Sequence, residues 1–218
     1  MPRLLFEKTG NAVWISHLDL MRVFQRAFKR AGLLLKHTQG FNPRPSVSIA
    51  LPLSVGVESV CELLDFELEG EQVSCDEICS RLNEVLVSGV KVHTVYNTGK
   101  KIRDLAFLRC SITMEYDNGV PHGAAEAVKA LFAQDTLIVQ KKTKNGIQDQ
   151  DIIPMIRYLN VAEESDSLRL DAVVCCQNPT LNPMQLPLAI SVYLPDYTPD
   201  FVRCRRIEVL DKDENIFR

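Results

Sequence analysis

The first indication of the fold comes from residues 14–56, which read WISHLDLMRVFQRAFKRAGLLLKHTQGFNPRPSVSIALPLSVG. This segment predicts an amphipathic helix that begins after the N-cap residue Ser16, carries Asp19 in its first turn and closes at Gly32. A loop rich in glycine, asparagine and proline follows at once, and it carries an aromatic residue and a further arginine. A basic helix next to such a loop favours a surface that holds a polyanion.

Two faces of the predicted helix carry different kinds of side chain. The apolar positions recur at helical spacing and predict a stripe that faces the core: Leu20, Phe24, Ala27, Phe28 and Ala31. The basic positions recur on another face: Arg22, Arg26, Lys29 and Arg30. At about 1.5 Å of rise per residue this basic row is about 12 Å long, enough to follow successive phosphates. A charged face is more often simply solvated, but here Asp19 is the only acidic neighbour.

The loop after the helix, QGFNPRP at residues 39–45, is predicted to be rigid because a glycine and two prolines restrict its backbone. Phe41 is expected to stack on an unpaired base while Arg44 meets a phosphate, a division of labour seen in the recognition of single-stranded RNA. The alternative, in which Phe41 packs into the core, stays open. The predicted RNA-binding residues are Arg22, Arg26, Lys29, Arg30, Phe41, Asn42 and Arg44.

His17 stands in the first turn of the same helix and is the candidate general base for RNA cleavage, although a structural hydrogen bond is the commoner role. The other histidines and the seven cysteines show no spacing typical of metal ligands. The phosphate-binding motifs GxxxxGK[ST] and GxGxxG are absent from the sequence. No metal or cofactor is therefore expected, and binding is favoured over catalysis.

Length and composition are those of an ordinary folded protein, with 218 residues, 46% hydrophobic and 24% charged. The net charge of −3 conceals an uneven distribution. Residues 1–50 hold eight basic and two acidic residues, a net charge of +6, whereas residues 51–98 hold two basic and nine acidic residues, a net charge of −7. The positive charge is local, so an electropositive face does not require a basic protein.

No apolar run approaches the roughly 18 residues that a membrane span needs, and the first residues lack the apolar core of a signal peptide. We therefore expect a cytoplasmic protein that makes no membrane contact, with its cysteines reduced.

Periodicity predicts an α+β protein with two tandem units that have antiparallel sheets, residues 1–98 and 104–212, joined by residues 99–103. In the first unit the predicted strands are 3–8, 33–37, 47–51, 60–68 and 90–96, and the predicted helices are 17–31 and 75–86. In the second unit the predicted strands are 105–115, 136–142, 168–175 and 201–210, and the predicted helices are 124–133 and 183–193. Both units then follow the βαββαβ order of a ferredoxin-like fold, with residues 148–161 left unplaced.

Four stretches within or next to residues 14–56 resemble a known family: SHLDLMR, RAFKRAG, QGFNPRP and ALPLSVGVES. They are similar to a radical-SAM-associated family of unknown function, whose members occur alone, or fused to or encoded beside radical SAM proteins and ribonuclease E/G. The resemblance implies a link to radical SAM enzymes or to RNA metabolism, with no established activity. This chain lacks the CxxxCxxC motif that would hold the radical SAM cluster, so it would be the partner of such an enzyme.

These observations predict a protein whose first unit binds RNA, either tRNA or rRNA, and assists a partner enzyme that modifies or processes that RNA. Two alternatives remain. In one, the basic face of an adaptor docks on an acidic surface of a radical SAM protein without RNA. In the other, the protein is a metal-independent endoribonuclease with His17 as base and with Arg22 or Arg26 stabilising the charged transition state.

Overall fold

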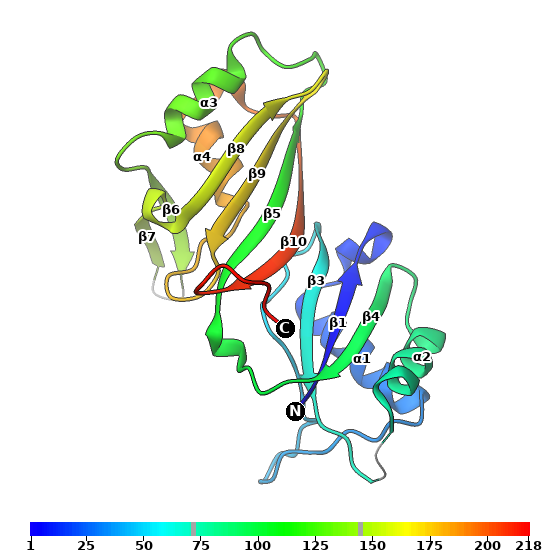
Figure 1. The fold of residues 1–218 in the computed structure, drawn as a ribbon. Coiled ribbons are helices and arrows are strands. Elements are labelled where there is room, and N and C mark those ends of the chain that lie inside the picture. The colour runs from blue at the N-terminus through cyan, green and yellow to red at the C-terminus, as the bar shows by residue number, and fades with distance from the viewer. Residues whose placement is uncertain (71–72, 144–145) are drawn as a thin grey trace. The chain divides into compact units, whose positions relative to one another are not determined.

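The computed structural model describes residues 1–70, 73–143 and 146–218 (Figure 1). The chain divides into two compact units, Met1–Ile102 together with Arg218, and Arg103–Phe217. Each unit combines α-helices with an antiparallel sheet. The protein is therefore of the α+β class.

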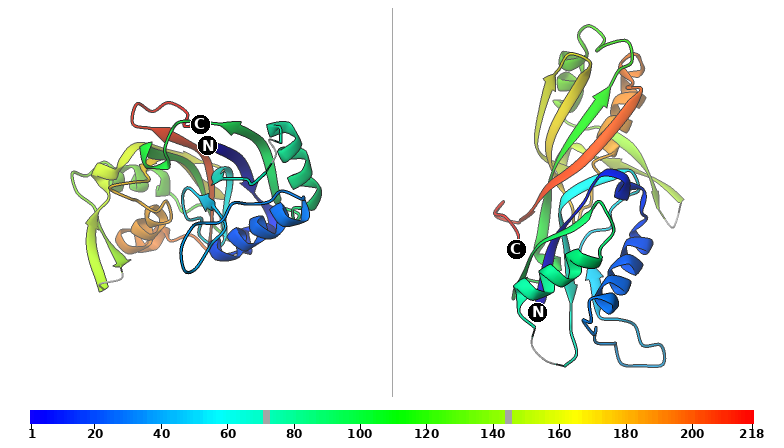
Figure 2. Two further views of the ribbon diagram at one scale, coloured as in Figure 1. Left: turned by 90° about the horizontal axis from the view of Figure 1, so that it is seen from below. Right: turned by 90° about the vertical axis from the view of Figure 1, so that its right-hand side faces the viewer.

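The sheet of the first unit has the strand order β4-β1-β3, and a short strand β2 pairs with β3. All of these pairs are antiparallel. The strands are β1 (Pro2–Lys8), β2 (Val47–Ile49), β3 (Val57–Phe66) and β4 (Val90–Asn97). The helical elements are the 3-10 turn η1 (Gly10–Trp14) and the helices α1 (His17–Arg30) and α2 (Cys75–Val85). Both α-helices lie on the same face of this sheet (Figure 2).

The core of the first unit forms where α1 meets the sheet. Four residues of the predicted stripe are fully buried, which confirms the face assigned to the core: Leu20, Phe24, Ala27 and Phe28. The Phe24 ring meets Phe6 of β1 edge-on, with ring centroids 4.7 Å apart, and the Phe28 ring lies 4.9 Å from that of Phe66. Burial of such a side chain contributes about 1.5–3 kcal/mol, so these contacts determine how α1 is rotated on the sheet.

The second unit has a main sheet of order β10-β5-β9-β8 and a separate hairpin of β6 and β7. Its strands are β5 (Leu105–Glu115), β6 (Ile138–Thr143), β7 (Gly146–Asp151), β8 (Ile156–Glu163), β9 (Ser167–Cys175) and β10 (Phe201–Asp211). Its α-helices, α3 (Ala124–Phe132) and α4 (Gln185–Tyr193), pack against each other. Short 3-10 turns complete the unit: η2 (Ile102–Asp104), η3 (Ile153–Met155) and η4 (Pro195–Tyr197).

The strand predicted at residues 33–37 is wrong. In this segment the structure has two isolated bridges, Leu35 with Leu68 and His37 with Pro45. The backbone of Lys36 forms hydrogen bonds with two different segments. Its N–H donates to the backbone carbonyl of Glu67 (2.9 Å), and its carbonyl accepts from the N–H of Ser46 (2.7 Å). Pro45 has no N–H to donate, so a regular ladder cannot continue into the loop.

The second strand of the second unit was assigned to the wrong segment. The strand predicted at residues 136–142 is β6, which pairs only with β7 in the hairpin. The main sheet instead takes β8, from the stretch that the sequence left unplaced, as the neighbour of β9. Because β8 is an edge strand with little alternation between buried and exposed positions, its period-two signal is weak.

Candidate nucleic-acid interface

Helix α1 begins where the sequence predicts. The hydroxyl of Ser16 accepts a hydrogen bond from the backbone N–H of Asp19 (3.2 Å) and donates to the carboxylate of the same residue (2.7 Å). Such a cap satisfies one of the free N–H groups of the first turn. The helix ends at Arg30, and Gly32 leaves it with a positive φ of 69°. With the core stripe buried, the opposite face of α1 is turned to solvent.

The four cations predicted on that face are not equivalent. Arg22 pairs with Asp19 across 2.7 Å, and Arg30 donates to the backbone carbonyl of Val85 at the end of α2. Arg26 and Lys29 are exposed, and neither side chain has a hydrogen bond or ion pair among the residues that the structure describes. Of these four cations, Arg26 and Lys29 are therefore the two that are free to bind a ligand.

The pairing of Asp19 is stable at neutral pH. The hydrogen bond from Ser16, and then the one from Arg22, lower the pKa of the Asp19 carboxyl. The carboxylate therefore stays charged wherever the protein is near neutral pH, and it keeps Arg22 occupied. The amino end of the basic row is thus close to electrically neutral.

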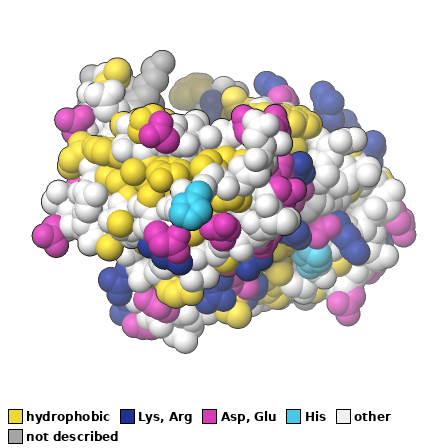
Figure 3. Space-filling model, turned by 90° about the horizontal axis from the view of Figure 1, so that it is seen from above, with side chains coloured by type: hydrophobic (Ala, Val, Ile, Leu, Met, Phe, Trp, Pro, Cys, Tyr) yellow, Lys and Arg dark blue, Asp and Glu magenta, His cyan; other side chains and the backbone are white. Residues whose placement is uncertain are grey.

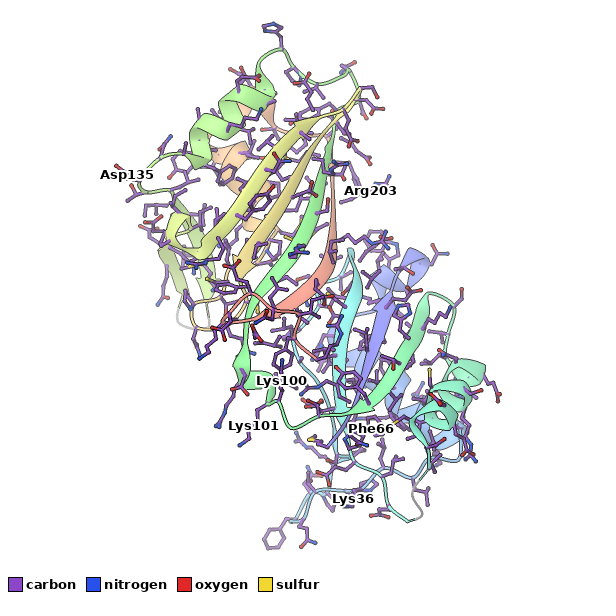
Figure 4. All side chains as sticks on the ribbon, in the orientation of Figure 1. Lys36, Phe66, Lys100, Lys101, Asp135 and Arg203 are labelled. Carbon is purple, nitrogen blue, oxygen red and sulfur yellow. The ribbon has the colours of Figure 1, made fainter. Side chains whose placement is uncertain are left out.

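The loop that follows α1 is closed at its base. The N–H of Thr38 donates to the carbonyl of Arg44 (2.8 Å), and the N–H of Arg44 donates to the hydroxyl of Thr38 (3.0 Å). Gly40 has a φ of 136°, in the region that favours glycine. This loop projects from the end of the first unit, beside Lys36, which Figure 4 labels.

The side chains at the tip of this loop point into solvent. Phe41 is fully exposed, so the alternative in which it packs into the core is wrong. Asn42 and Arg44 are exposed as well, and their side chains have no hydrogen bond or ion pair in the described part of the chain. A fully exposed phenylalanine gains nothing from burial in the folded protein, which leaves both faces of its ring available to a ligand.

A groove connects the helix to the loop. It encloses about 340 Å³ and is lined by Gln25 and Lys29 from α1, by Pro45 at the loop base, and by Leu33, Leu34, Leu35, His37 and Glu69. Since Lys29 and Pro45 border the same groove, the carboxyl half of α1 lies beside the base of the loop. We call this region the α1–loop surface and define it by Arg26, Lys29, Phe41, Asn42 and Arg44.

Acidic groups of the same unit neutralise part of this region. Glu67 lies 3.4 Å from the ammonium group of Lys36, and Glu69 borders the groove. Three cations of the α1–loop surface keep no acidic partner among the described residues: Arg26, Lys29 and Arg44. By comparison, on the face seen in Figure 3, acidic side chains lie among the basic ones.

Of the two cations proposed to act with His17 in cleavage, Arg22 is paired with Asp19, and Arg26 lies away from His17. At about 100° of rotation per residue, Arg26 lies on the opposite side of α1 from His17, about 13 Å further along the axis. Among the described residues the buried Nδ1 of His17 has no hydrogen-bond partner. A histidine base normally needs such a partner to orient its ring. The geometry therefore gives the nuclease alternative no support.

Two exposed apolar residues at the amino end of α1 were absent from the predicted interface. Trp14 is 66% exposed and Leu18 is 69% exposed. The helical spacing of Leu18, four residues before Arg22, was enough to place it on the solvent face. The exposure of Trp14 follows from the turn η1, which the sequence did not predict.

A comparison of sequence families identifies the chain. The model of DUF2344, described as an uncharacterized protein conserved in bacteria, matches residues 2–183. The chain belongs to the DUF2344 family. The match covers the whole α1–loop surface and most of the second unit. No curated protein matches this DUF2344 sequence.

At low sequence identity, a solved structure with a TM-score of 0.50 resembles this DUF2344 member in fold alone. A chain in a crystal structure of a Cbf5-Nop10-Gar1 complex is 11% identical, with a TM-score of 0.50, and the alignment covers 98% of this chain and 50% of that one. This chain thus spans about half the length of that neighbour. An unknown protein from Galdieria sulphuraria is 12% identical, with a TM-score of 0.27 and coverage of 94% and 96%.

The described residues show neither a metal cluster nor a membrane-spanning helix. They contain no group of three or more His, Cys, Asp or Glu side chains that could hold a metal ion. Nor do they contain a helix with the length and apolar character needed to cross a membrane.

Proposed function

We propose that the first unit binds RNA through the α1–loop surface. The observation that carries the proposal is the combination of three cations that have no acidic partner in the described residues with a fully exposed phenylalanine, on α1 and on the loop whose base shares a groove with it. Cationic side chains hold the phosphates of a nucleic acid, and an exposed aromatic ring stacks on an unpaired base. A protein that binds RNA with unpaired bases uses both kinds of group.

The charge on this surface sets the expected strength of binding. For a single-stranded nucleic acid, the logarithm of the binding constant falls linearly with the logarithm of the salt concentration. The slope is about −0.7 for each phosphate that is neutralised, so three cations give a slope of about −2. Such a surface binds moderately and is sensitive to salt. It suits a protein that presents RNA to another factor.

The proposed role is to assist a cytoplasmic enzyme that modifies or processes tRNA or rRNA. The similarity of residues 14–56 to the radical-SAM-associated family supports a radical SAM protein, or ribonuclease E/G, as that partner. The position of His17, on the side of α1 opposite Arg26, favours binding over cleavage by this chain itself.

The proposal includes a finer description of the fold, in which each unit is a ferredoxin-like domain. The strand orders β4-β1-β3-β2 and β10-β5-β9-β8 support it, because the fourth strand of each unit lies beside the first, and the second beside the third. In each unit one α-helix follows the first of these strands and another follows the third.

Titration of RNA against the protein on filters, at low and at physiological salt, tests the function. We expect wild type to bind more weakly as salt rises, and the triple variant Arg26→Ala, Lys29→Ala, Arg44→Ala to lose most of its binding. The control is Arg81→Ala, an arginine of α2 that is already paired with Glu77 and should leave binding unchanged. Absence of binding at both salt concentrations would contradict the proposal, as would equal binding by the triple variant.

A protein-interaction adaptor is the second candidate, and the surface of α4 favours it. This helix is apolar on almost all sides, and Leu188, Val192 and Tyr193 are exposed. Contiguous exposed apolar side chains often mark a protein contact. A protein partner that stays bound after nuclease treatment of a lysate would favour the adaptor, whereas an association through RNA would be lost.

A further inference from the structure

The indole ring of Trp14 lies near the backbone of Gly56 and is largely exposed. Trp14 ends η1, two residues before the cap of α1. A Cβ added to Gly56 would lie 3.6 Å from the atom Cζ3 of this ring. The N–H of Gly56 donates to the carbonyl of Val13 (2.9 Å), which holds this backbone beside the ring. Since Trp14 is 66% exposed, the ring offers an apolar platform at the surface.

Exposed residues of α1 lie between Trp14 and the α1–loop surface. Leu18 is exposed, and Leu18, Arg22 and Arg26 occupy successive positions four residues apart. Residues at this spacing form one line along a helix. A ligand lying along the exposed face of α1 would therefore pass from Trp14, over the line of Leu18, Arg22 and Arg26, to the free cations near the loop.

Trp14 and Phe41 lie at opposite ends of this line. The turn η1 and the loop after α1 are at the two ends of the helix in the right-hand view of Figure 2. The helix has 14 residues, which at a rise of about 1.5 Å each makes it about 21 Å long. At about 3.4 Å for each stacked nucleotide, about six nucleotides would cover the helix alone, and the loop that carries Phe41 extends further.

The chemistry of the two ends selects one form of RNA. An aromatic side chain stacks on a base only when the face of that base is free, as in an unpaired strand. In a duplex the internal bases stack on each other, and both aromatic platforms would be left without a partner. Asp19, beside Arg22, also makes the Trp14 end poor in net positive charge, so this end suits a base better than a phosphate.

We infer that Trp14 is a second stacking platform, and that the ligand is a single-stranded stretch of RNA, longer than the roughly six nucleotides that cover α1, held between Trp14 and Phe41. The free cations Arg26 and Lys29 would contact its phosphates between the two rings. This inference rests on the proposed RNA-binding function and names the form of RNA that the surface takes.

The single tryptophan of the chain gives a direct measurement. We would titrate wild type with a single-stranded 12-nucleotide RNA and with a blunt duplex of the same length, while the anisotropy of labelled RNA reports binding. The single strand should quench the Trp14 fluorescence with the same midpoint as the anisotropy change. The duplex should bind more weakly and leave the fluorescence nearly unchanged.

Substitutions then locate the two platforms. Trp14→Ala and Phe41→Ala should each weaken binding of the 12-nucleotide strand by about fivefold or more, the usual effect of removing one stacked aromatic ring. Trp14→Phe should keep most of the affinity. Val87→Ala, which shortens another exposed apolar side chain of the first unit, is the matched control and should change nothing.

The outcomes separate this inference from the proposed function. If the single strand binds to wild type but leaves the fluorescence of Trp14 unchanged, and Trp14→Ala binds as well as wild type, the second platform does not exist and the RNA-binding surface stands. Equal affinity for the duplex would likewise overturn the selection for single strands. If neither RNA binds to wild type, the proposed function itself fails.

Discussion

Two arginines of α1 already have hydrogen-bond partners within the protein, one close in the sequence and one far from it. Asp19, one helical turn away, holds Arg22, and the carbonyl of Val85, which comes from another helix, holds Arg30. Arg26, between them in the sequence, has no such neighbour in the described residues. The ability of each cation to bind a phosphate therefore depends on what surrounds it and not on its presence in the basic row.

At the same scale, one buried ion pair supports the first unit. The guanidinium of Arg3 meets the carboxylate of Asp65 with two hydrogen bonds, of 2.5 and 3.0 Å, across the paired strands β1 and β3. Both residues are buried, so each supplies the opposite charge that the other needs away from water, and Arg3 also donates to the backbone carbonyl of Lys100 (3.0 Å).

We expect Asp65→Ala to lower the free energy of unfolding by about 3–5 kcal/mol, because it leaves the arginine charge buried without its carboxylate. The control is Glu77→Ala, which breaks the exposed pair with Arg81 and should cost less than about 1 kcal/mol. Urea denaturation of both variants gives the measurement. A loss of the same small size in both would show that the buried pair matters no more than a surface pair.

Among the elements, η1 and the turn before β4 depend on a close approach of two backbones. The N–H of Thr9 donates to the carbonyl of Gly89 (2.8 Å), and Gly89 has a φ of 83°. A Cβ at this position would collide with the carbonyl oxygen of Thr9 and would lie 2.8 Å from the Cβ of Ala12. Only glycine fits both the conformation and the space.

Gly89→Ala should therefore destabilise the protein by about 2–4 kcal/mol, from backbone strain together with the steric clash. Gly32→Ala separates the two causes, because Gly32 also has a positive φ, of 69°, but no atom within 4 Å of an added Cβ. That variant should lose only about 1–2 kcal/mol. The two urea midpoints provide the comparison, and equal losses would mean that contact with η1 is unimportant.

Across the whole molecule, the seven cysteines are free thiols, five of them buried: Cys61, Cys110, Cys175, Cys176 and Cys204. Burial raises the pKa of Cys176 to about 12 and that of Cys204 to about 11. At pH 8 these groups are almost entirely protonated, and the protonated thiol is not the reactive form. Cys75 and Cys79 are only partly buried.

A thiol reagent at pH 8 should label the native protein at Cys75 first and at Cys79 more slowly, since burial and then Asp76 raise the pKa of the Cys79 thiol. All seven cysteines should react in denaturant. Mass spectrometry of the labelled peptides identifies the sites. Rapid labelling of Cys176 in the native state would show that the second unit opens far more readily than its packing implies.

Local patterns in the sequence were sufficient for α1 and for β5. The cap at Ser16 and the stripe containing Leu20 and Phe24 depend on residues three or four positions apart, so neighbouring residues already determine them. The bounds of β5 were predicted as they are observed, because its apolar positions alternate within one continuous run. The α+β class and the assignment to two units follow from the order of such segments.

Only the tertiary structure decided which residues of the basic row are free, and that β8 rather than β6 lies beside β9. It also showed that the segment 33–37 makes single bridges, and that Phe41 and Trp14 lie open to solvent. These outcomes depend on contacts between residues far apart in the chain, such as Arg30 with Val85. A local pattern predicts an element and its buried face, but the partner that meets each side chain depends on how the elements pack.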